Sequence, residues 1–263
     1  MEEKSLIRKR AIETYLKRFP IIILMMSICS IIILTVNLII NTITSSIPNN
    51  SVKLVLLLFS IYVVFQLLYG LNKTFMRIIN DEKVTDIFSF LKDAISRFRS
   101  PLASMLLVIL VATVYMIAVS IVGVFAMSIA ASIQGKNSPI IESIRSLTII
   151  IATFVIIIKV IPYEFAFFIL AEDENKSISG LQALKKSKAL LKDHVIDYII
   201  LLLPIVGIFL AAVIALALFH NFVYPIFSNP TVYYGVSILL EIAITPLVRL
   251  VEINYYNFLK DEK

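Results

Sequence analysis

Long apolar runs alternate along the chain with short segments rich in lysine and arginine. A bilayer core about 30 Å thick is crossed by roughly 20 apolar residues of helix, and six runs are about that long. They are Ile21–Ile40, Leu54–Leu71, Leu102–Ala131, Leu147–Leu170, Tyr198–Phe219 and Val232–Val251. Strands of a membrane barrel would instead be about ten residues long with alternating polarity. The pattern predicts an all-α integral membrane protein with six transmembrane helices in a single membrane domain, residues 1–263.

A basic segment followed by two apolar runs occurs three times, which predicts three parallel hairpin units at about 1–71, 84–170 and 178–256. Each basic segment is expected to form a helix along the cytoplasmic membrane interface. In the middle segment, helical spacing relates the apolar residues Val84, Ile87, Phe88, Leu91, Ile95 and Phe98. The opposite face carries Lys92, Asp93, Ser96 and Arg99. We therefore predict a surface helix over 84–99 that buries its Phe88, Leu91 and Ile95 side.

The third basic segment divides into two arcs when it is drawn as a helix. One arc carries the small and apolar residues Gly180, Ala183, Leu184, Ser187 and Leu191. The basic residues of the segment are Lys185, Lys186, Lys188, Lys192 and His194. Lysine clusters beside a membrane are attracted to anionic head groups. We predict that this basic patch faces anionic lipids or a membrane partner.

The distribution of charge predicts the orientation of the chain. Lysine and arginine number 24 against 18 Asp and Glu, a net charge of +6. Twenty of the basic residues lie in the terminal segments and the 72–101 and 171–195 loops, whereas the intervening loops hold only Lys53, Lys136 and Arg145. Cytoplasmic loops carry such an excess. We predict a multi-pass protein of the cell membrane with both termini in the cytoplasm, and its charge needs no nucleic-acid partner.

Charged residues inside the predicted spans are the strongest functional signal, because such residues are costly in lipid. The fourth span contains Lys159 and Glu164, and the sixth contains Glu241 and Arg249. Measured at 1.5 Å per residue from the outer ends, opposite charges fall at matching depths. The pattern predicts the pairs Lys159–Glu241 and Glu164–Arg249. They would form either a structural clamp or the polar lining of a path.

Two prolines lie near these charges and are expected to interrupt their helices. Pro162 and Pro246 fall at nearly the same predicted depth in the fourth and sixth spans. A proline inside a helix lacks the N–H that would bond one turn back. We predict a helix break at each of them.

Two stretches of the C-terminal part suggest a family. The run "PYEFAFFILAEDENKSISGLQALKKSKALLKDHVIDYIILLLPIVG" and the ending "PLVRLVEINYYNFLK" resemble the glycerophosphoryl diester phosphodiesterase membrane-domain-like superfamily of six-helix bacterial and archaeal proteins. The positions that carry the resemblance are Glu172, Asp173, Ala183, Leu184, Ser187, Lys188, Pro246 and Tyr255 or Tyr256. Asp193 departs from the family pattern, which usually has glycine there. The resemblance covers about residues 160–260. It implies a six-helix membrane domain and supplies no catalytic residues.

Motifs for catalysis are not found in the chain. It has no His-Glu-x-x-His or Gly-x-Ser-x-Gly motif, and its two histidines, His194 and His220, lie at opposite ends of the fifth span. We expect no enzyme activity, no cofactor and no metal. The first functional class is a noncatalytic scaffold, accessory subunit or envelope-protective protein, with anionic lipids, a membrane partner or a second copy as partners. The alternative is a small permease or lipid transporter with a path between the fourth and sixth helices.

Overall fold

Helices make up nearly all of the computed structural model, which describes residues 2–80, 82, 84, 86–97, 99–134, 139–222 and 230–262. In chain order they are α1 (Glu2–Lys17), α2 (Phe19–Ser46), α3 (Asn50–Ile79), α4 (Ser89–Ser96), α5 (Arg99–Gln134), α6 (Pro139–Val160), the 3-10 helix η1 (Ile161–Tyr163), α7 (Ala166–Glu172), α8 (Gly180–Leu191), α9 (Val195–Phe222) and α11 (Pro230–Asp261). None of the described residues lies in a strand. The predicted all-helical class is therefore confirmed.

Several described segments are long and apolar enough to cross a membrane. The five are Phe19–Ser46, Asn50–Ile79, Arg99–Ile133, Pro139–Glu172 and Val195–Ala212. By the length and composition of its helices the chain is a multi-spanning membrane protein. The sixth predicted run lies inside α11, so the crossing at this helix and the six-span arrangement stay predictions.

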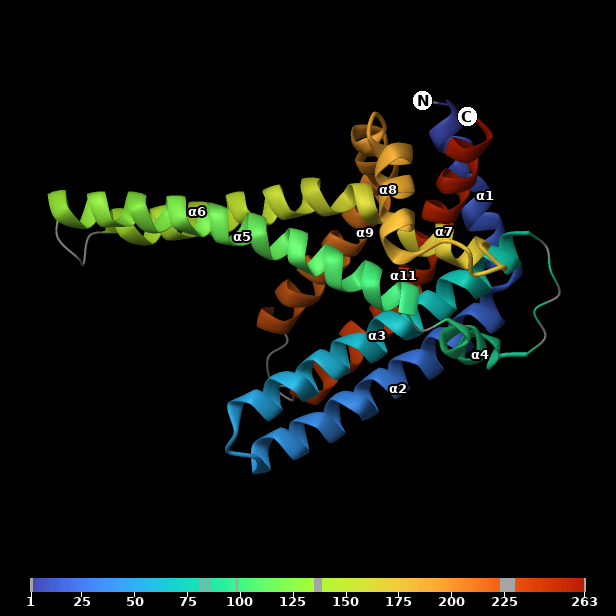
Figure 1. Ribbon diagram of the computed structural model, residues 1–263, viewed down its shortest axis with the longest axis horizontal. Helices are drawn as coiled ribbons and strands as arrows, with labels where there is room; N and C mark the ends of the chain where they lie inside the picture. The colour runs from blue at the N-terminus through green and yellow to red at the C-terminus, as the bar shows by residue number, and fades with distance from the viewer. Residues whose placement is uncertain are drawn as a thin grey trace.

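The long helices pack in pairs, and each pair follows a shorter helix. Helix α1 precedes α2 and α3, α4 precedes α5 and α6, and α8 precedes α9 and α11. Helix α11 packs against α1, α2 and α3, which brings the two termini side by side (Figure 1). The α5–α6 hairpin instead runs away from the α2–α3 hairpin (Figure 1). The long helices therefore diverge from a shared base.

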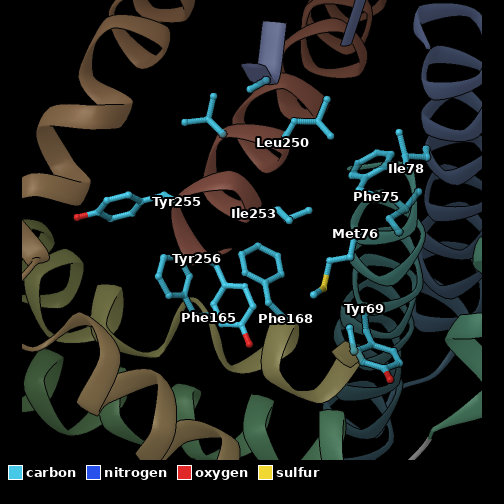
Figure 2. Packing of buried hydrophobic residues seen from close by; sticks show 14 of the residues in the cluster. Tyr69, Phe75, Met76, Ile78, Phe165, Phe168, Leu250, Ile253, Tyr255 and Tyr256 are labelled. Carbon is cyan, nitrogen blue, oxygen red and sulfur yellow. The ribbon is translucent and has the colours of Figure 1, made fainter. Parts of the chain in front are cut away.

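The hydrophobic core lies in this base, where the short helices meet the ends of the long ones. Phe75 of α3, Phe165 and Phe168 near α7, and Tyr255 and Tyr256 of α11 are nearly or completely buried there (Figure 2). The halves of the hairpins that lie away from this base bury few side chains, and α6 buries none. Lipid is as apolar as a leucine side chain, so such helices have little hydrophobic drive to cover one another.

The middle short helix, α4, is shorter than the predicted 84–99. It spans Ser89–Ser96 and buries Phe90, Asp93 and Ala94. The protein itself leaves Phe88 56% and Ile95 81% exposed, whereas Leu91 is partly buried against the core, so burial of this side in the membrane interface stays a prediction.

Helix α4 approaches α3 closely at a glycine of α3. A Cβ at Gly70 would lie only 2.1 Å from the carbonyl oxygen of Phe90 and 2.9 Å from Cβ of Ala94. The two backbones can approach this closely only through small residues. The backbone at Phe90 and the methyl group of Ala94 therefore face α3. Asp93 of the same side forms ion pairs with Lys73 and Arg77 of α3.

The third short helix, α8, matches its prediction. Its buried residues are Gly180, Ala183, Leu184, Ser187 and Leu191. Ser179 and Gln182 form a capping box at its N-terminus, which satisfies two backbone N–H groups. Gly180 contacts α5 so closely that a Cβ would lie 2.5 Å from the carbonyl oxygen of Ser100. Helix α8 is therefore held directly against the start of α5.

Candidate functional site

Four polar side chains form a connected cluster in the base, which we name the charge clamp: Glu164, Tyr198, Arg249 and Glu252. Nη1 of Arg249 donates to Oε1 of Glu164 and, at 2.7 Å, to Oε2 of Glu252. The hydroxyl of Tyr198 donates to Oε1 of Glu252 at 2.6 Å. Glu164 lies in the turn between η1 and α7, Tyr198 in α9, and the other two in α11. The clamp therefore ties three separate elements together.

The members of the clamp differ in their access to the surroundings. The Glu252 side chain is 5% exposed, whereas those of Arg249 and Glu164 are 23% and 29% exposed. Both oxygens of Glu252 accept a hydrogen bond, so this buried carboxylate is fully partnered. Two carboxylates share one guanidinium, which gives the ionised cluster a formal charge of −1. The predicted set of charges was neutral, and this one is not.

Aromatic rings pack beside the clamp. Phe165 follows Glu164 in sequence and is completely buried. Its ring makes edge contacts with Tyr198 and Tyr256, at centroid distances of 5.7 and 5.6 Å. Phe168 packs against Phe165 and Tyr256 in the same layer (Figure 2). These contacts restrict the positions of Glu164 and Tyr198, and they help to keep Glu252 out of contact with water.

The structure brings together only one of the two predicted charge pairs. Glu164 and Arg249 contact each other in the clamp. Lys159 and Glu241 are both exposed, and no ion pair joins these two described residues. Instead, Nζ of Lys159 lies 5.5 Å from the ring centroid of Tyr115, close enough for a cation–π contact.

The missing pair is explained by the shape of the fourth span. Depths were compared along straight helices, but α6 ends at Val160 and the chain turns through η1 before α7 begins. Lys159 therefore belongs to the hairpin that α6 forms with α5, which diverges from the rest of the protein (Figure 1). Glu164 lies beyond the turn, in the base, where it meets α11. The prediction of a Lys159–Glu241 pair is wrong for this reason.

Pro162 and Pro246 behave differently. Pro162 lies in η1, at a real interruption, and its carbonyl accepts a hydrogen bond from the Ser187 hydroxyl of α8 at 2.8 Å. Pro246 lies inside α11, which continues through it, so the second predicted helix break is wrong. Tyr15 of α1 donates to the carbonyl of Ala243 at 2.8 Å, near the place where the proline withholds a bond. The carbonyl that the proline leaves without its helical N–H is that of Ile242, one residue earlier.

Two members of the clamp were not predicted from the sequence. Glu252 lies one residue beyond the predicted sixth span, and Tyr198 is the first residue of the fifth. The spacing of Arg249 and Glu252 could have predicted their contact, because residues three apart lie on the same side of a helix. No sequence signal placed Tyr198, from a different helix, beside them.

The predicted basic patch lies on α8 and the turn after it. Lys185, Lys186, Lys188 and Lys192 are all exposed. His194 is half-buried, and its Nδ1 lies 3.9 Å from Oδ2 of Asp197. Asp197 also accepts a hydrogen bond from Nζ of Lys4 at 2.5 Å, which ties α1 to the start of α9. The four lysines therefore form an accessible surface, and His194 belongs to a contact within the protein.

A second buried ion pair joins α4 and α5 to the loop before α8. Nη2 of Arg97 lies 3.0 Å from Oδ2 of Asp173, and their side chains are 4% and 7% exposed. Nη1 of Arg97 also donates to the carbonyl of Leu170 at 2.8 Å. Burial alone would raise the pKa of Asp173, but hydrogen bonds from the backbone N–H of Ile178, from the Ser177 hydroxyl and from Arg97 lower it to about 2. Asp173 is therefore ionised in the folded protein at neutral pH.

Comparison with known proteins adds no family to these observations. No protein-family model, curated protein or solved structure matches the chain. The resemblance to the phosphodiesterase membrane-domain-like superfamily therefore stays a prediction from the residues quoted above.

Proposed function

We propose that this protein is a noncatalytic membrane scaffold or accessory subunit whose α5–α6 hairpin binds the spans of a partner. The observation that best supports this role is the contrast between the two parts of the molecule. The base is held by the charge clamp and by the Arg97–Asp173 pair. The α5–α6 hairpin runs away from this base (Figure 1) and leaves apolar residues such as Ile121, Phe125 and Phe154 exposed.

The packing within the hairpin supports a fixed binding surface. A Cβ at Gly123 of α5 would lie 2.3 Å from Cγ2 of Thr148 in α6. Small residues at such a crossing let two membrane helices pack closely without a hydrophobic drive. The hairpin can therefore keep its shape while its outer faces meet lipid or another protein.

The alternative, a permease, would place a water-accessible path between the fourth and sixth helices. Such a path needs polar groups from α6 and α11 that face each other. Lys159 of α6 instead lies against Tyr115 of the adjacent α5. This placement favours the scaffold.

Photo-crosslinking tests the scaffold directly. A photo-reactive amino acid is placed at Phe154 of α6, and a matched one at Ile196, which is exposed in the base. We expect irradiation of living cells to give a discrete protein adduct from the hairpin position only. Adducts with lipid alone, or the same adducts from both positions, would argue against a binding surface on the hairpin.

Thiol labelling tests the permease. Cys29 is buried and is the only cysteine, so Cys29→Ala gives a background without thiols. Single cysteines are then introduced as Lys159→Cys, Glu241→Cys and, for comparison, Ile150→Cys on the apolar face of α6. A scaffold predicts that a membrane-impermeant thiol reagent labels all three slowly. Rapid labelling of 159 and 241 alone would indicate a water-filled path and support the permease.

A further inference from the structure

A small groove lies between α5 and α8, apart from the charge clamp. Its volume is about 160 Å³, and its lining residues are Leu107, Val108, Val111, Tyr163, Leu181, Leu184, Lys185 and Lys188. The α5 residues and the two leucines of α8 make most of this lining apolar. Two lysines are the only charged side chains among them.

The α8 residues of the groove form one stripe along the helix. Leu181, Leu184, Lys185 and Lys188 are related by steps of three and four residues, so they share a side of α8. Neither lysine makes an ion pair with any residue that the structure describes, and both are exposed. The groove therefore combines an apolar surface with two positive charges that have no acceptor from the described chain.

The groove is held in shape by contacts on both sides. The hydroxyl of Ser104 in α5 donates to the carbonyl of Gly180 at 3.1 Å, at the start of α8. The hydroxyl of Ser187 donates to the carbonyl of Pro162 at 2.8 Å, next to Tyr163 of the groove. Helix α8 is thus attached to α5 and to η1 without help from the groove residues. The groove is formed before any ligand arrives.

We propose that this groove binds one anionic glycerophospholipid, with an acyl chain against Leu107 and Val111 and the phosphate between Lys185 and Lys188. The occupant must supply both an apolar chain and negative charge, and a lipid of this class has both. Lysine side chains readily lie along an apolar surface while their ammonium groups reach a head group. This lipid site goes beyond the scaffold role and does not depend on it.

Lipid retention on the purified full-length protein tests the proposal. The protein is transferred to detergent micelles with phosphatidylglycerol, an anionic lipid, or with phosphatidylcholine, and bound lipid is counted by native mass spectrometry. The test variant is Lys185→Gln with Lys188→Gln. The control is Lys186→Gln with Lys192→Gln, which removes the same charge from α8 and the turn after it but outside the groove lining.

We expect the wild-type protein and the control to retain one phosphatidylglycerol and little phosphatidylcholine. The test variant should bind phosphatidylglycerol roughly 30-fold more weakly, because each of the two lysines near an anionic surface contributes about 1 kcal/mol. Equal weakening in the two double variants would overturn the proposal, since it would show a general attraction to the basic patch. Unchanged retention in the test variant would overturn it too.

A second variant tests the apolar part. Val111→Phe fills the groove without changing charge, and it should abolish retention of the one lipid. Retention at the wild-type level would show that the acyl chain lies elsewhere and would overturn the site. Glycerol phosphate at millimolar concentration should not displace the lipid. Displacement would show that the head group alone is recognised and would overturn the proposed acyl-chain site. Thermal unfolding of each variant, followed through Cys29, confirms that it is folded.

Discussion

Removal of Arg249 tests whether the charge clamp is built around Glu252 or around Glu164. Arg249→Met keeps an unbranched side chain of similar reach but removes the guanidinium. It leaves Glu252 in the core with a hydrogen bond from Tyr198 and no positive partner. Glu164 is also released, but its side chain is 29% exposed and Glu252 is only 5% exposed. The loss of stability should therefore come mainly from the buried Glu252 carboxylate, which is left without a positive partner.

The expected loss follows from the burial of the pair. Removing one partner of a buried ion pair destabilises a protein by about 3–5 kcal/mol. Arg249 is 23% exposed, so we expect the lower end, about 3 kcal/mol. A change of 1 kcal/mol shifts the melting temperature of a chain of this size by about 2–4 °C. Arg249→Met should therefore lower the melting temperature by about 6–12 °C.

The chain carries its own reporter for this measurement. It has no tryptophan, but its only cysteine, Cys29, is 2% exposed in the folded state. A dye that fluoresces on reaction with thiols therefore reports unfolding as Cys29 becomes accessible. The variant Cys29→Ala gives the background signal.

Two double variants separate the carboxylates. Adding Glu252→Gln to Arg249→Met removes the stranded charge and keeps an oxygen for Tyr198, so it should restore about 1–3 kcal/mol. Adding Glu164→Gln instead should restore much less, because that carboxylate can reach solvent. Equal rescue by the two additions, or no rescue by Glu252→Gln, would refute the assignment of Glu252 as the buried centre of the clamp.

Three further predictions follow from the base and the topology. Gly70→Ala places a methyl group against the backbone of α4 and should lower the melting temperature by several degrees, whereas Gly207→Ala, with open space around it, should not; equal effects would contradict the close approach. Because the folded pKa of Asp173 is lowered to about 2, its stabilisation of about 2 kcal/mol is present above about pH 4 and is lost as the pH falls toward 2. Asp173→Asn should therefore destabilise the protein at pH 7, and the free energy of unfolding of the variant should fall less between pH 4 and pH 2 than that of the wild type. An unchanged stability at pH 7 would contradict this. In cells, Asn50→Cys should react with an external impermeant thiol reagent and Lys188→Cys should not. Labelling of Lys188→Cys alone would contradict the predicted cytoplasmic location of the termini.

The sequence by itself determined the class of the protein. Apolar runs of about 20 residues can satisfy their backbone in lipid only as helices, which is why helical class and multiple spans were predictable. It also identified the charged positions that need an explanation, and it predicted the buried arc of α8. In α8, Gly180, Ala183, Leu184, Ser187 and Leu191 recur at helical spacing on one arc, and the lysines lie outside it, so the pattern predicts the orientation.

The tertiary structure decided which apolar face meets protein. Phe88 and Ile95 of α4 are as apolar as Phe90, and a sequence pattern separates apolar from polar faces but not protein from lipid. Lipid removes the hydrophobic preference for protein contact. The side of α4 that meets α3 is instead the one that fits the close approach at Gly70 and pairs Asp93 with Lys73 and Arg77.

The tertiary structure also decided the partners of the charges. Depth along a straight helix placed Lys159 opposite Glu241, but the turn at Pro162 leaves Lys159 with Tyr115 and carries Glu164 into the base. There Arg249 meets Glu164 together with Glu252, while Tyr198 completes the cluster from α9. Ion pairs act over a few ångströms, so their partners depend on how the helices turn and cross, and spacing along one chain does not contain that information.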